Sequence, residues 1–303
     1  MSLDPAVPQR LHDLVDAFAQ TTQAVIDLGR SCGVDDLAQP TECPGWTVHD
    51  QLSHVVGVES RLAGHLDPRV EMPDYGHIRN DVGKRVEFAV EVRRGRTGTE
   101  VVAELEDVLA QRLSTLRDPV LTDSSIIAGP FGPDLAATVV LMRTFDVWAH
   151  EQDIRSALGR PGNLDSPAAA VFVSAVMLQL PRLIAKGAGL EPGHAVVIVV
   201  TGPIVARQGV RVDVDEQGRT RGHALIAGDV PGPASTDAPG SSAHDEPARI
   251  SEQEPDDATT ISLSTEAFTR RAAGRRSVSD TEYSVVGDDA IARRVMEALV
   301  VTH

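Results

Sequence analysis

Apolar side chains recur every three or four residues through most of the first 190 residues, which is the spacing of amphipathic helices. This pattern predicts a first helix over residues 11–29 and a second helix that begins after Thr47. Thr47 followed by Asp50 is a variant of the capping box, in which two side chains satisfy free backbone N–H groups at a helix start. Between these helices, Pro44 and Gly45 suit the central positions of a type II turn.

Further helical segments are expected before residue 190. The sequence GRTG separates a segment over residues 77–94 from one over residues 98–116. After a loop rich in glycine and proline, the next helix should begin near Asp134 or Leu135 and continue to about Leu158, where GRPG ends it. One more apolar segment, at residues 166–186, completes the helical part.

The pattern changes after His194, where short β-branched segments bounded by turn residues predict strands. These segments lie at residues 195–202, 206–215, 218–228 and 259–265. Helical patterns at residues 264–274 and 288–300 alternate with them. The sequence therefore predicts two domains: a helical bundle over residues 1–190 and a small α+β domain over residues 191–303.

Residues 229–257 depart from both patterns. They contain five prolines and eight acidic residues against one arginine, with no aromatic side chain. Such a segment cannot bury enough apolar surface to offset its ordering entropy, so a disordered or loosely held insertion in the second domain is expected. An acidic interaction segment is the functional alternative to a plain loop.

Composition narrows the possible partners and the compartment. The 303 residues carry a net charge of −16, which repels nucleic-acid phosphates and anionic lipid surfaces, so small molecules or proteins are the expected partners. The two cysteines, Cys32 and Cys43, are too few for a disulfide framework. The N-terminus lacks the pattern of a signal peptide, and no long uncharged apolar run is evident. A cytoplasmic, soluble protein is expected.

The helix expected up to Leu158 carries ionisable residues where core side chains would lie. At 100° per residue, one narrow stripe contains Leu135, Val139, Met142, Asp146, His150 and Asp153. A carboxylate on an apolar face should be paired, protonated or bound to a cation. Asp146 and His150 are one turn apart, as two ligands of one ion on one helix must be. Such spacing more often belongs to a carboxylate–histidine hydrogen bond or to a surface pair.

His54 is the natural third ligand, although periodicity does not select it. The apolar stripe of its helix runs through Val48, Leu52 and Val55, and His54 lies away from the centre of that stripe. The pattern predicts either a partly exposed histidine or one that borders an open cleft.

Two stretches resemble the signature regions of the actinobacterial mycothiol-dependent maleylpyruvate isomerase family. They are ECPGWTVHDQLSHV at residues 42–55 and RTFDVWAHEQDIRSALGRPG at residues 143–162. The C-terminal part, ending VVGDDAIARRVMEALV, is similar to that family's small α+β domain. The resemblance implies a DinB-like up-and-down four-helix bundle followed by a domain related to sterol-carrier folds. It covers nearly the whole chain apart from residues 229–257.

Carried over from the family, the metal ligands would be His54, Asp146 and His150, with Asp153 behind them or in the cleft. The family's usual acid at the middle position is glutamate, and the shorter Asp146 departs from that pattern. Two imidazoles and one carboxylate suit Zn²⁺ with a fourth position open to water or substrate, and nickel, iron or cobalt could bind the same set.

The resemblance also implies a cosubstrate, the thiol mycothiol, in the conversion of maleylpyruvate to fumarylpyruvate. Coordination to a divalent cation ionises a thiol, which can then add to the cis double bond. Rotation about the resulting single bond and elimination give the trans product. A thiol transferase that keeps the thioether would use the same device. The family's arginine for a substrate carboxylate corresponds to Arg275 in AAGRR, with Arg276 adjacent, although a solvated arginine at a helix end is an equally simple interpretation.

The same residues are compatible with two other functions. One is a metal-dependent hydrolase in which the ion activates water and Asp153 or Glu151 serves as the base. The other is a noncatalytic protein that binds small molecules or regulates a partner on the same fold. Trp46 and Trp148 could line the pocket, but packing is the more common role of such aromatic side chains.

Overall fold

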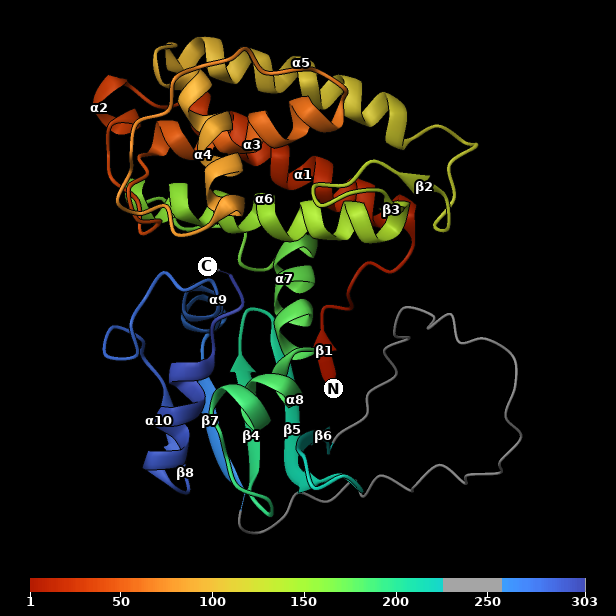
Figure 1. The fold of residues 1–303 in the computed structure, drawn as a ribbon, viewed down its shortest axis with the longest axis vertical. Coiled ribbons are helices and arrows are strands. Elements are labelled where there is room, and N and C mark those ends of the chain that lie inside the picture. The colour runs from red at the N-terminus through yellow and green to blue at the C-terminus, as the bar shows by residue number, and fades with distance from the viewer. Residues whose placement is uncertain (226–257, 303) are drawn as a thin grey trace. The chain divides into compact units, whose positions relative to one another are not determined.

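The computed structural model describes residues 1–225 and 258–302, which form two compact units (Figure 1). One unit is Val7–Phe172, and the other combines Met1–Ala6 with Val173–His303. The first unit is helical and the second combines a mixed sheet with helices, as the sequence predicts for the coarse fold class. The division falls within a helix and earlier than the expected boundary at residue 190. The insertion predicted at residues 229–257 lies outside the described residues.

Besides the first residues of α7 (Pro167–Met177), the helical unit contains six complete helices and one short two-stranded ribbon among its described residues. They are α1 (Leu11–Arg30), α2 (Val34–Leu37), α3 (Val48–Leu62), α4 (Asp81–Arg94), α5 (Gly98–Leu116), β2 (Ile126–Ile127), β3 (Asp134–Leu135) and α6 (Ala136–Leu158). Helix α4 begins later than expected because the side chain of Asn80 caps it, accepting a hydrogen bond from the backbone N–H of Gly83 at 2.8 Å. Helix α6 ends at Gly159, which adopts the left-handed conformation with φ of 61°.

The residues at the start of α3 form the turn and the capping box that the sequence predicts. The Thr47 N–H donates to Asp50 Oδ2 at 2.9 Å, and Thr47 Oγ1 accepts from the Asp50 N–H at 3.3 Å, which completes the capping box. Upstream, Gly45 has φ of 81°, and the Trp46 N–H donates to the Cys43 carbonyl at 3.1 Å. The turn at Pro44 and Gly45 thus leads the chain directly into α3.

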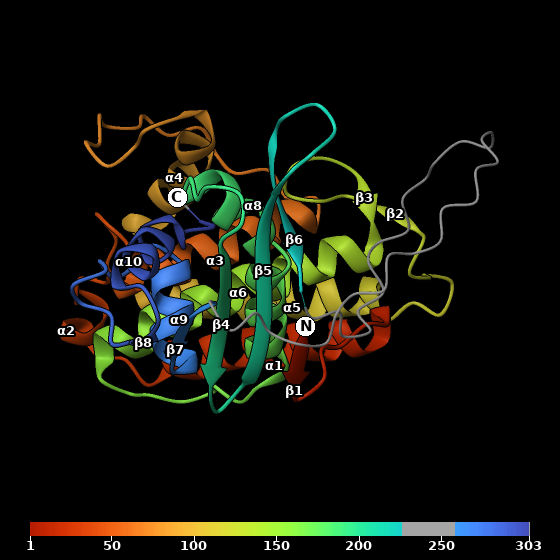
Figure 2. The same ribbon diagram turned by 90° about the horizontal axis from the view of Figure 1, so that it is seen from below.

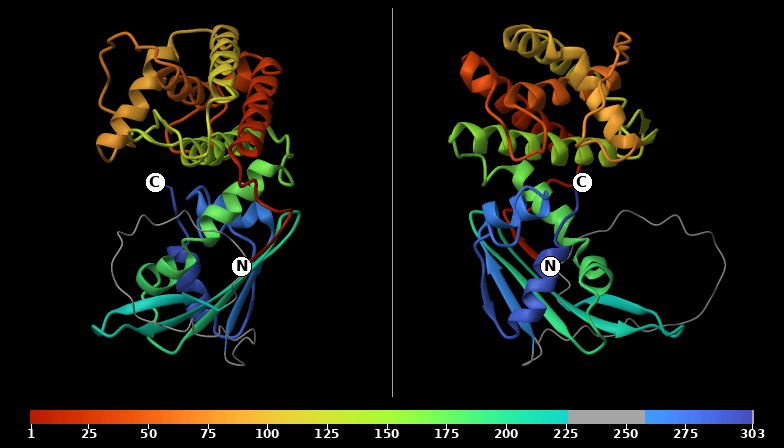
Figure 3. Two further views of the ribbon diagram at one scale, coloured as in Figure 1. Left: turned by 90° about the vertical axis from the view of Figure 1, so that its right-hand side faces the viewer. Right: turned by 60° about the vertical axis from the view of Figure 1, so that its left-hand side comes forward.

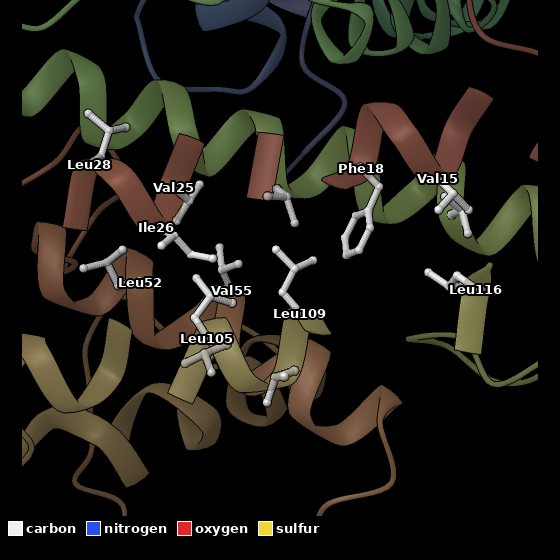
Figure 4. Close-up of a cluster of buried hydrophobic side chains, with 14 of the residues drawn as sticks. Val15, Phe18, Val25, Ile26, Leu28, Leu52, Val55, Leu105, Leu109 and Leu116 are labelled. Carbon is white, nitrogen blue, oxygen red and sulfur yellow. The ribbon is translucent and has the colours of Figure 1, made fainter. Parts of the chain in front are cut away.

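The core of the helical unit lies between α1, α3, α5 and α6 (Figure 4). Helix α1 packs against α5 and α6, and α3 packs against α4, α5 and α6. Large apolar side chains fill the space between them, among them Phe18, Leu52 and Leu105, each with no exposed surface. Because α3 is covered by three helices, His54 is only 4% exposed. The expectation of a partly exposed His54 was therefore wrong.

The second unit is built on a six-stranded mixed sheet. Its elements are β1 (Ser2–Asp4), α8 (Leu180–Arg182), the π-helix η1 (Leu183–Gly187), β4 (Ala195–Thr201), β5 (Val205–Val214), β6 (Thr220–Ala224), β7 (Thr259–Leu263), α9 (Thr265–Ala272), β8 (Ser284–Val286) and α10 (Asp289–Ala298). The strand order is β1-β5-β4-β7-β8, and β6 pairs with the C-terminal half of β5. The sequence did not predict β1 or β8, which have only three residues each.

Strands β4 and β5 form the long antiparallel centre of this sheet (Figure 2), with Val196 opposite Val210. Strand β4 pairs in parallel with β7 on its other side, with Ile198 opposite Ile261. Helices α8 and α10 contact strands of this twisted sheet (Figure 3). A glycine is required at position 222 in β6, because a Cβ atom there would lie 2.2 Å from the Pro181 carbonyl oxygen.

One predicted helix at residues 166–186 is three segments, α7 (Pro167–Met177), α8 and η1. Pro181 has no backbone N–H, so the hydrogen bond that would reach the Met177 carbonyl is missing and the helix breaks. The stretch Pro167–Gly187 is long and apolar enough to cross a membrane, with mean hydropathy of 1.8. However, 67% of its most apolar part is buried within the protein. Such burial is typical of a core helix.

Candidate metal centre

Three side chains from two helices converge inside the helical unit: His54 on α3, and Asp146 and His150 on α6. One potential ligand atom from each lies within 4.8 Å of the other two. His54 Nε2 is 3.3 Å from Asp146 Oδ2, and His150 Nε2 is 3.6 Å from Asp146 Oδ1. The centroids of the two imidazole rings are 4.4 Å apart, with the rings edge to face. The structure therefore brings together the three residues predicted as ligands.

The site opens toward solvent at its carboxylate. His54 and His150 are 4% and 7% exposed, whereas the side chain of Asp146 keeps 34% of its surface. A set of three donors with one accessible side resembles catalytic metal sites, which leave a position for water or substrate, more than closed structural sites.

Trp46 forms one wall of the site. Its ring centroid lies 5.1 Å from that of His54 and 5.9 Å from that of His150. The indole Nε1–H donates to Glu87 Oε2 at 2.9 Å, which fixes the ring against both imidazoles. Trp148 instead packs on Phe172, with ring centroids 5.3 Å apart, and serves the core.

Two groups hold His150 from behind. Its Nδ1 lies 2.6 Å from Gln51 Oε1 and 3.4 Å from Asp153 Oδ2. Gln51 Nε2 donates to Thr41 Oγ1, whose own hydroxyl donates to the Trp46 carbonyl, so Gln51 turns its carbonyl oxygen toward His150. Nδ1 must then carry the hydrogen, which leaves the Nε2 lone pair facing Asp146 in neutral His150.

The protonation of the three residues follows from their surroundings. Burial, reinforced by the neighbouring His150, lowers the pKa of His54 to about 4. Burial would raise the pKa of Asp146, but Arg143 and the two histidines hold it well below its usual value. For His150, burial lowers the pKa, yet Asp146 and Asp153 outweigh it and raise the pKa above normal. At neutral pH, Asp146 is thus ionised and His54 neutral, the forms that bind cations.

This donor set fits a divalent cation. The two imidazole Nε2 atoms and the carboxylate face one another, and His150 has the hydrogen-bonded Nδ1 that histidine ligands usually have. His54 differs, because its Nδ1 is buried without a hydrogen-bond partner.

The structure places the other predicted residues as follows. Asp153, with no exposed surface, lies behind His150. Glu151 is buried away from the triad, where its carboxylate accepts hydrogen bonds from Thr21, Arg155 and Asn163. Arg275 lies in the other unit, just after α9, and its Nη1 donates to the Ala273 carbonyl at 3.0 Å.

Sequence reasoning missed two contributors, Gln51 and Arg143. Arg143 Nη1 donates to Asp146 Oδ2 at 2.9 Å. Arg143 precedes Asp146 by three positions on α6, so helical spacing was the signal that could have found it. Gln51 contacts His150 on another helix, and the spacing within α3 gives no such signal.

A family model described as the mycothiol maleylpyruvate isomerase N-terminal domain matches residues 9–155. A crystal structure of the mycothiol-dependent maleylpyruvate isomerase is 15% identical, covers 90% of this chain and 92% of that chain, and has a TM-score of 0.49. A mutant of the same enzyme gives the same identity and coverage with a TM-score of 0.47.

A third solved structure is the colibactin self-resistance protein ClbS in complex with a dsDNA. It is 13% identical, covers 52% of this chain and all of that chain, and has a TM-score of 0.38. No curated protein matches the chain. The region matched by the family model contains all three residues of the triad and the residues that surround them.

Proposed function

Residues 9–155 belong to the family of the mycothiol maleylpyruvate isomerase N-terminal domain, and on this premise we propose that the protein is a metal-dependent enzyme that uses mycothiol as a cosubstrate. It acts as a cis-trans isomerase or as a thiol transferase on an electrophilic unsaturated acid. The observation that carries this proposal is the convergence of His54, Asp146 and His150 within 4.8 Å of one another.

In this proposal the cation is held by His54 Nε2, His150 Nε2 and the Asp146 carboxylate. Two nitrogen donors and one oxygen donor favour Zn²⁺, and nickel, iron or cobalt are compatible with the same set. When bound, the cation supplies the positive charge that ionises a thiol at neutral pH.

The remaining residues prepare the site. Gln51 keeps the hydrogen of His150 on Nδ1, so that Nε2 is available as a donor. Asp153 stabilises positive charge on the same ring, a carboxylate–histidine arrangement common behind metal ligands. Trp46 packs beside both imidazole rings, and Asp146 keeps the accessible side of the site.

The finer description of the chain is part of the same proposal. The packing of α1, α3, α5 and α6 around one core supports a DinB-like four-helix bundle. A sterol-carrier-like character of the second unit is proposed from the family resemblance, and a cytoplasmic location from the low cysteine content. Arg275 is proposed as the cation for a substrate carboxylate, and its replacement in Arg275→Gln should raise KM for the acid more than it lowers kcat.

The activity test follows the ultraviolet absorbance of maleylpyruvate with purified, metal-loaded protein and mycothiol. We expect turnover only when both thiol and metal are present, and its loss in His150→Ala. His12→Ala is the matched control, because His12 is an exposed histidine on α1 whose side chain keeps 81% of its surface. A metal-loaded protein that binds no thiol and turns over no unsaturated acid would contradict the proposal.

The hydrolase alternative is distinguished in the same assay. It requires a general base beside the cation, and Glu151 already accepts three hydrogen bonds on another face of α6. Asp153 is the remaining base, but it faces the His150 ring. Hydrolysis of an ester or amide substrate without any thiol would favour this alternative, whereas metal-free protein that binds small molecules would favour a noncatalytic role.

A further inference from the structure

A second group of charges lies directly behind the triad, in the core of the helical unit. Glu59 on α3 binds two arginines from different helices. Its Oε1 accepts from Arg143 Nε of α6 at 2.6 Å, and its Oε2 accepts from Arg112 Nε of α5 at 3.0 Å. Arg143 then donates from Nη1 to Asp146 Oδ2 at 2.9 Å. The network therefore ends on a residue of the candidate metal centre.

The network is buried and electrically balanced only when Asp146 is included. Glu59 has no exposed surface, and the side chains of Arg112 and Arg143 are 5% and 4% exposed. Two guanidinium groups on one carboxylate leave one positive charge, which the carboxylate of Asp146 offsets. Asp146 is thus the fourth charged group of this network, and it also contacts the two histidines of the triad.

Stability alone does not explain this arrangement. Buried ion pairs are weak sources of stability, because desolvation cancels most of the attraction. The Nη2 atoms of Arg112 and Arg143 are moreover buried without a hydrogen-bond partner. A buried network that leaves two donors unsatisfied calls for another explanation, and positioning of a functional group is one.

The network also ties together the two helices that supply the ligands. Glu59 follows His54 by five residues on α3, and Arg143 precedes Asp146 by three residues on α6. The bond between Glu59 and Arg143 therefore joins α3 to α6 close to the ligands that the two helices supply.

We propose that Arg143, held by Glu59 and Arg112, is a positioning residue that sets the orientation of the Asp146 carboxylate for cation binding. This inference rests on the proposed function, because it assumes that the triad binds a cation. Aspartate is one methylene shorter than glutamate, so its carboxylate must be held at a defined point between the two imidazoles. Arg143 provides that point by engaging Oδ2, while Oδ1 faces His150 Nε2.

The effect of removing Arg143 on cation affinity distinguishes a positioning role from a purely electrostatic one. A positive charge beside a metal ligand repels a cation, so removal of Arg143 would then tighten binding. A positioning role predicts weaker binding and a changed ligand geometry, since residues that support metal ligands typically contribute about 10-fold to 100-fold in affinity.

The test is a titration of metal-free protein with Co²⁺, followed by calorimetry and by the visible absorption bands of the bound ion, which report ligand geometry. The variants are Arg143→Gln, Arg143→Lys and Glu59→Gln, each checked for folding by circular dichroism. Arg143→Lys keeps the positive charge but not the planar fork that reaches two carboxylates. Arg117→Gln is the matched control, because Arg117 forms an exposed ion pair with Asp16 on the same unit.

We expect wild type and Arg117→Gln to bind Co²⁺ alike, and each of the other variants to bind at least about 10-fold more weakly with shifted absorption bands. If Arg143→Gln does not fold, Arg143→Lys decides by the same criteria. Unchanged or tighter binding with an unchanged spectrum in folded variants would overturn the positioning role and leave the metal centre standing. Absence of Co²⁺ binding to wild type would overturn the metal centre itself.

Discussion

The Nδ1 atom of His150 lies 2.6 Å from the Oε1 atom of Gln51. This contact joins α3 to α6 and determines which nitrogen of His150 faces Asp146. Gln51 is itself fully buried and is oriented by its bond to Thr41. The loop before α3 therefore helps to set the tautomer of a histidine about a hundred residues later in the chain.

Replacement of Gln51 by leucine should weaken metal binding without unfolding the protein. Leucine keeps the volume of the side chain but removes the nearer of the two acceptors at His150 Nδ1, so only Asp153 Oδ2, at 3.4 Å, still holds the ring. We expect a loss of Zn²⁺ affinity of about 10-fold to 100-fold in competition titrations. Gln23→Leu, at an exposed position of α1, should leave the affinity unchanged. Equal Zn²⁺ affinities of the two variants would show that Gln51 does not support metal binding.

Metal affinity should rise with pH and then level off. A cation cannot bind His150 Nε2 while a proton occupies it, and Asp146 and Asp153 raise the pKa of His150 above its ordinary value. Burial lowers the pKa of His54 to about 4, so His54 does not compete in the neutral range. Below the pKa of His150 we expect the dissociation constant to fall by about 10-fold per pH unit, with release of one proton. Calorimetry in buffers of different ionisation enthalpy measures both quantities, and a constant affinity between pH 5.5 and 8.5 would contradict this assignment.

In the metal-free protein, the contribution of His150 to the stability of the folded state should decrease as pH rises. Because the folded-state pKa of His150 is raised, the proton stabilises the folded state. This contribution is complete below the unfolded pKa of histidine and is lost as pH rises through the folded pKa. Urea unfolding of metal-free wild type and His150→Gln across this range checks the sign. A stability difference that grows with pH would be inconsistent with a raised pKa.

Glu87 should stabilise the wall of the site formed by Trp46. Burial would raise the pKa of Glu87, but hydrogen bonds from His77, Trp46 and Arg94 lower it below the usual value. Its contribution is therefore present above the unfolded pKa and is lost as pH falls through the folded pKa. Glu87→Ala should cost about 2 kcal/mol at neutral pH, because it leaves buried donors unpaired.

Urea unfolding followed by tryptophan fluorescence measures this effect. Glu106→Ala is the control, because Glu106 pairs with Arg30 at the surface at 2.8 Å, and exposed pairs contribute less than about 1 kcal/mol. The difference between the two variants should shrink as pH falls below the folded pKa of Glu87. If both variants were equally destabilised at neutral pH, the contact between Glu87 and Trp46 would make no particular contribution to stability.

Most helices and the central strands could be predicted from the sequence because their signals are local. The capping box at Thr47 and Asp50 and the β-branched run of β4 depend only on neighbouring residues. Strand β1 could not be predicted in this way, because its three residues become a strand only by pairing with β5 far along the chain. The same pairing explains why the first six residues belong to the second unit.

In the candidate site too, some features follow from the local sequence and others depend on contacts between distant segments. Asp146 and His150 lie one turn apart, so their proximity follows from helical geometry. The burial of His54 did not follow, because three helices cover α3 and an apolar stripe no longer separates a buried face from an exposed one. Gln51, Glu59 and Arg143 act across helices, and their partners are known only once the helices are packed.

The central claim is that one divalent cation is held jointly by His54, Asp146 and His150. The most direct measurement is anomalous diffraction at the zinc edge from crystals of the Zn²⁺-loaded protein. The account predicts one strong peak with both imidazole Nε2 atoms and an Asp146 oxygen at coordination distances of about 2.0–2.2 Å. A peak bound by other groups, or a well-ordered triad without a peak between its three side chains, would contradict it.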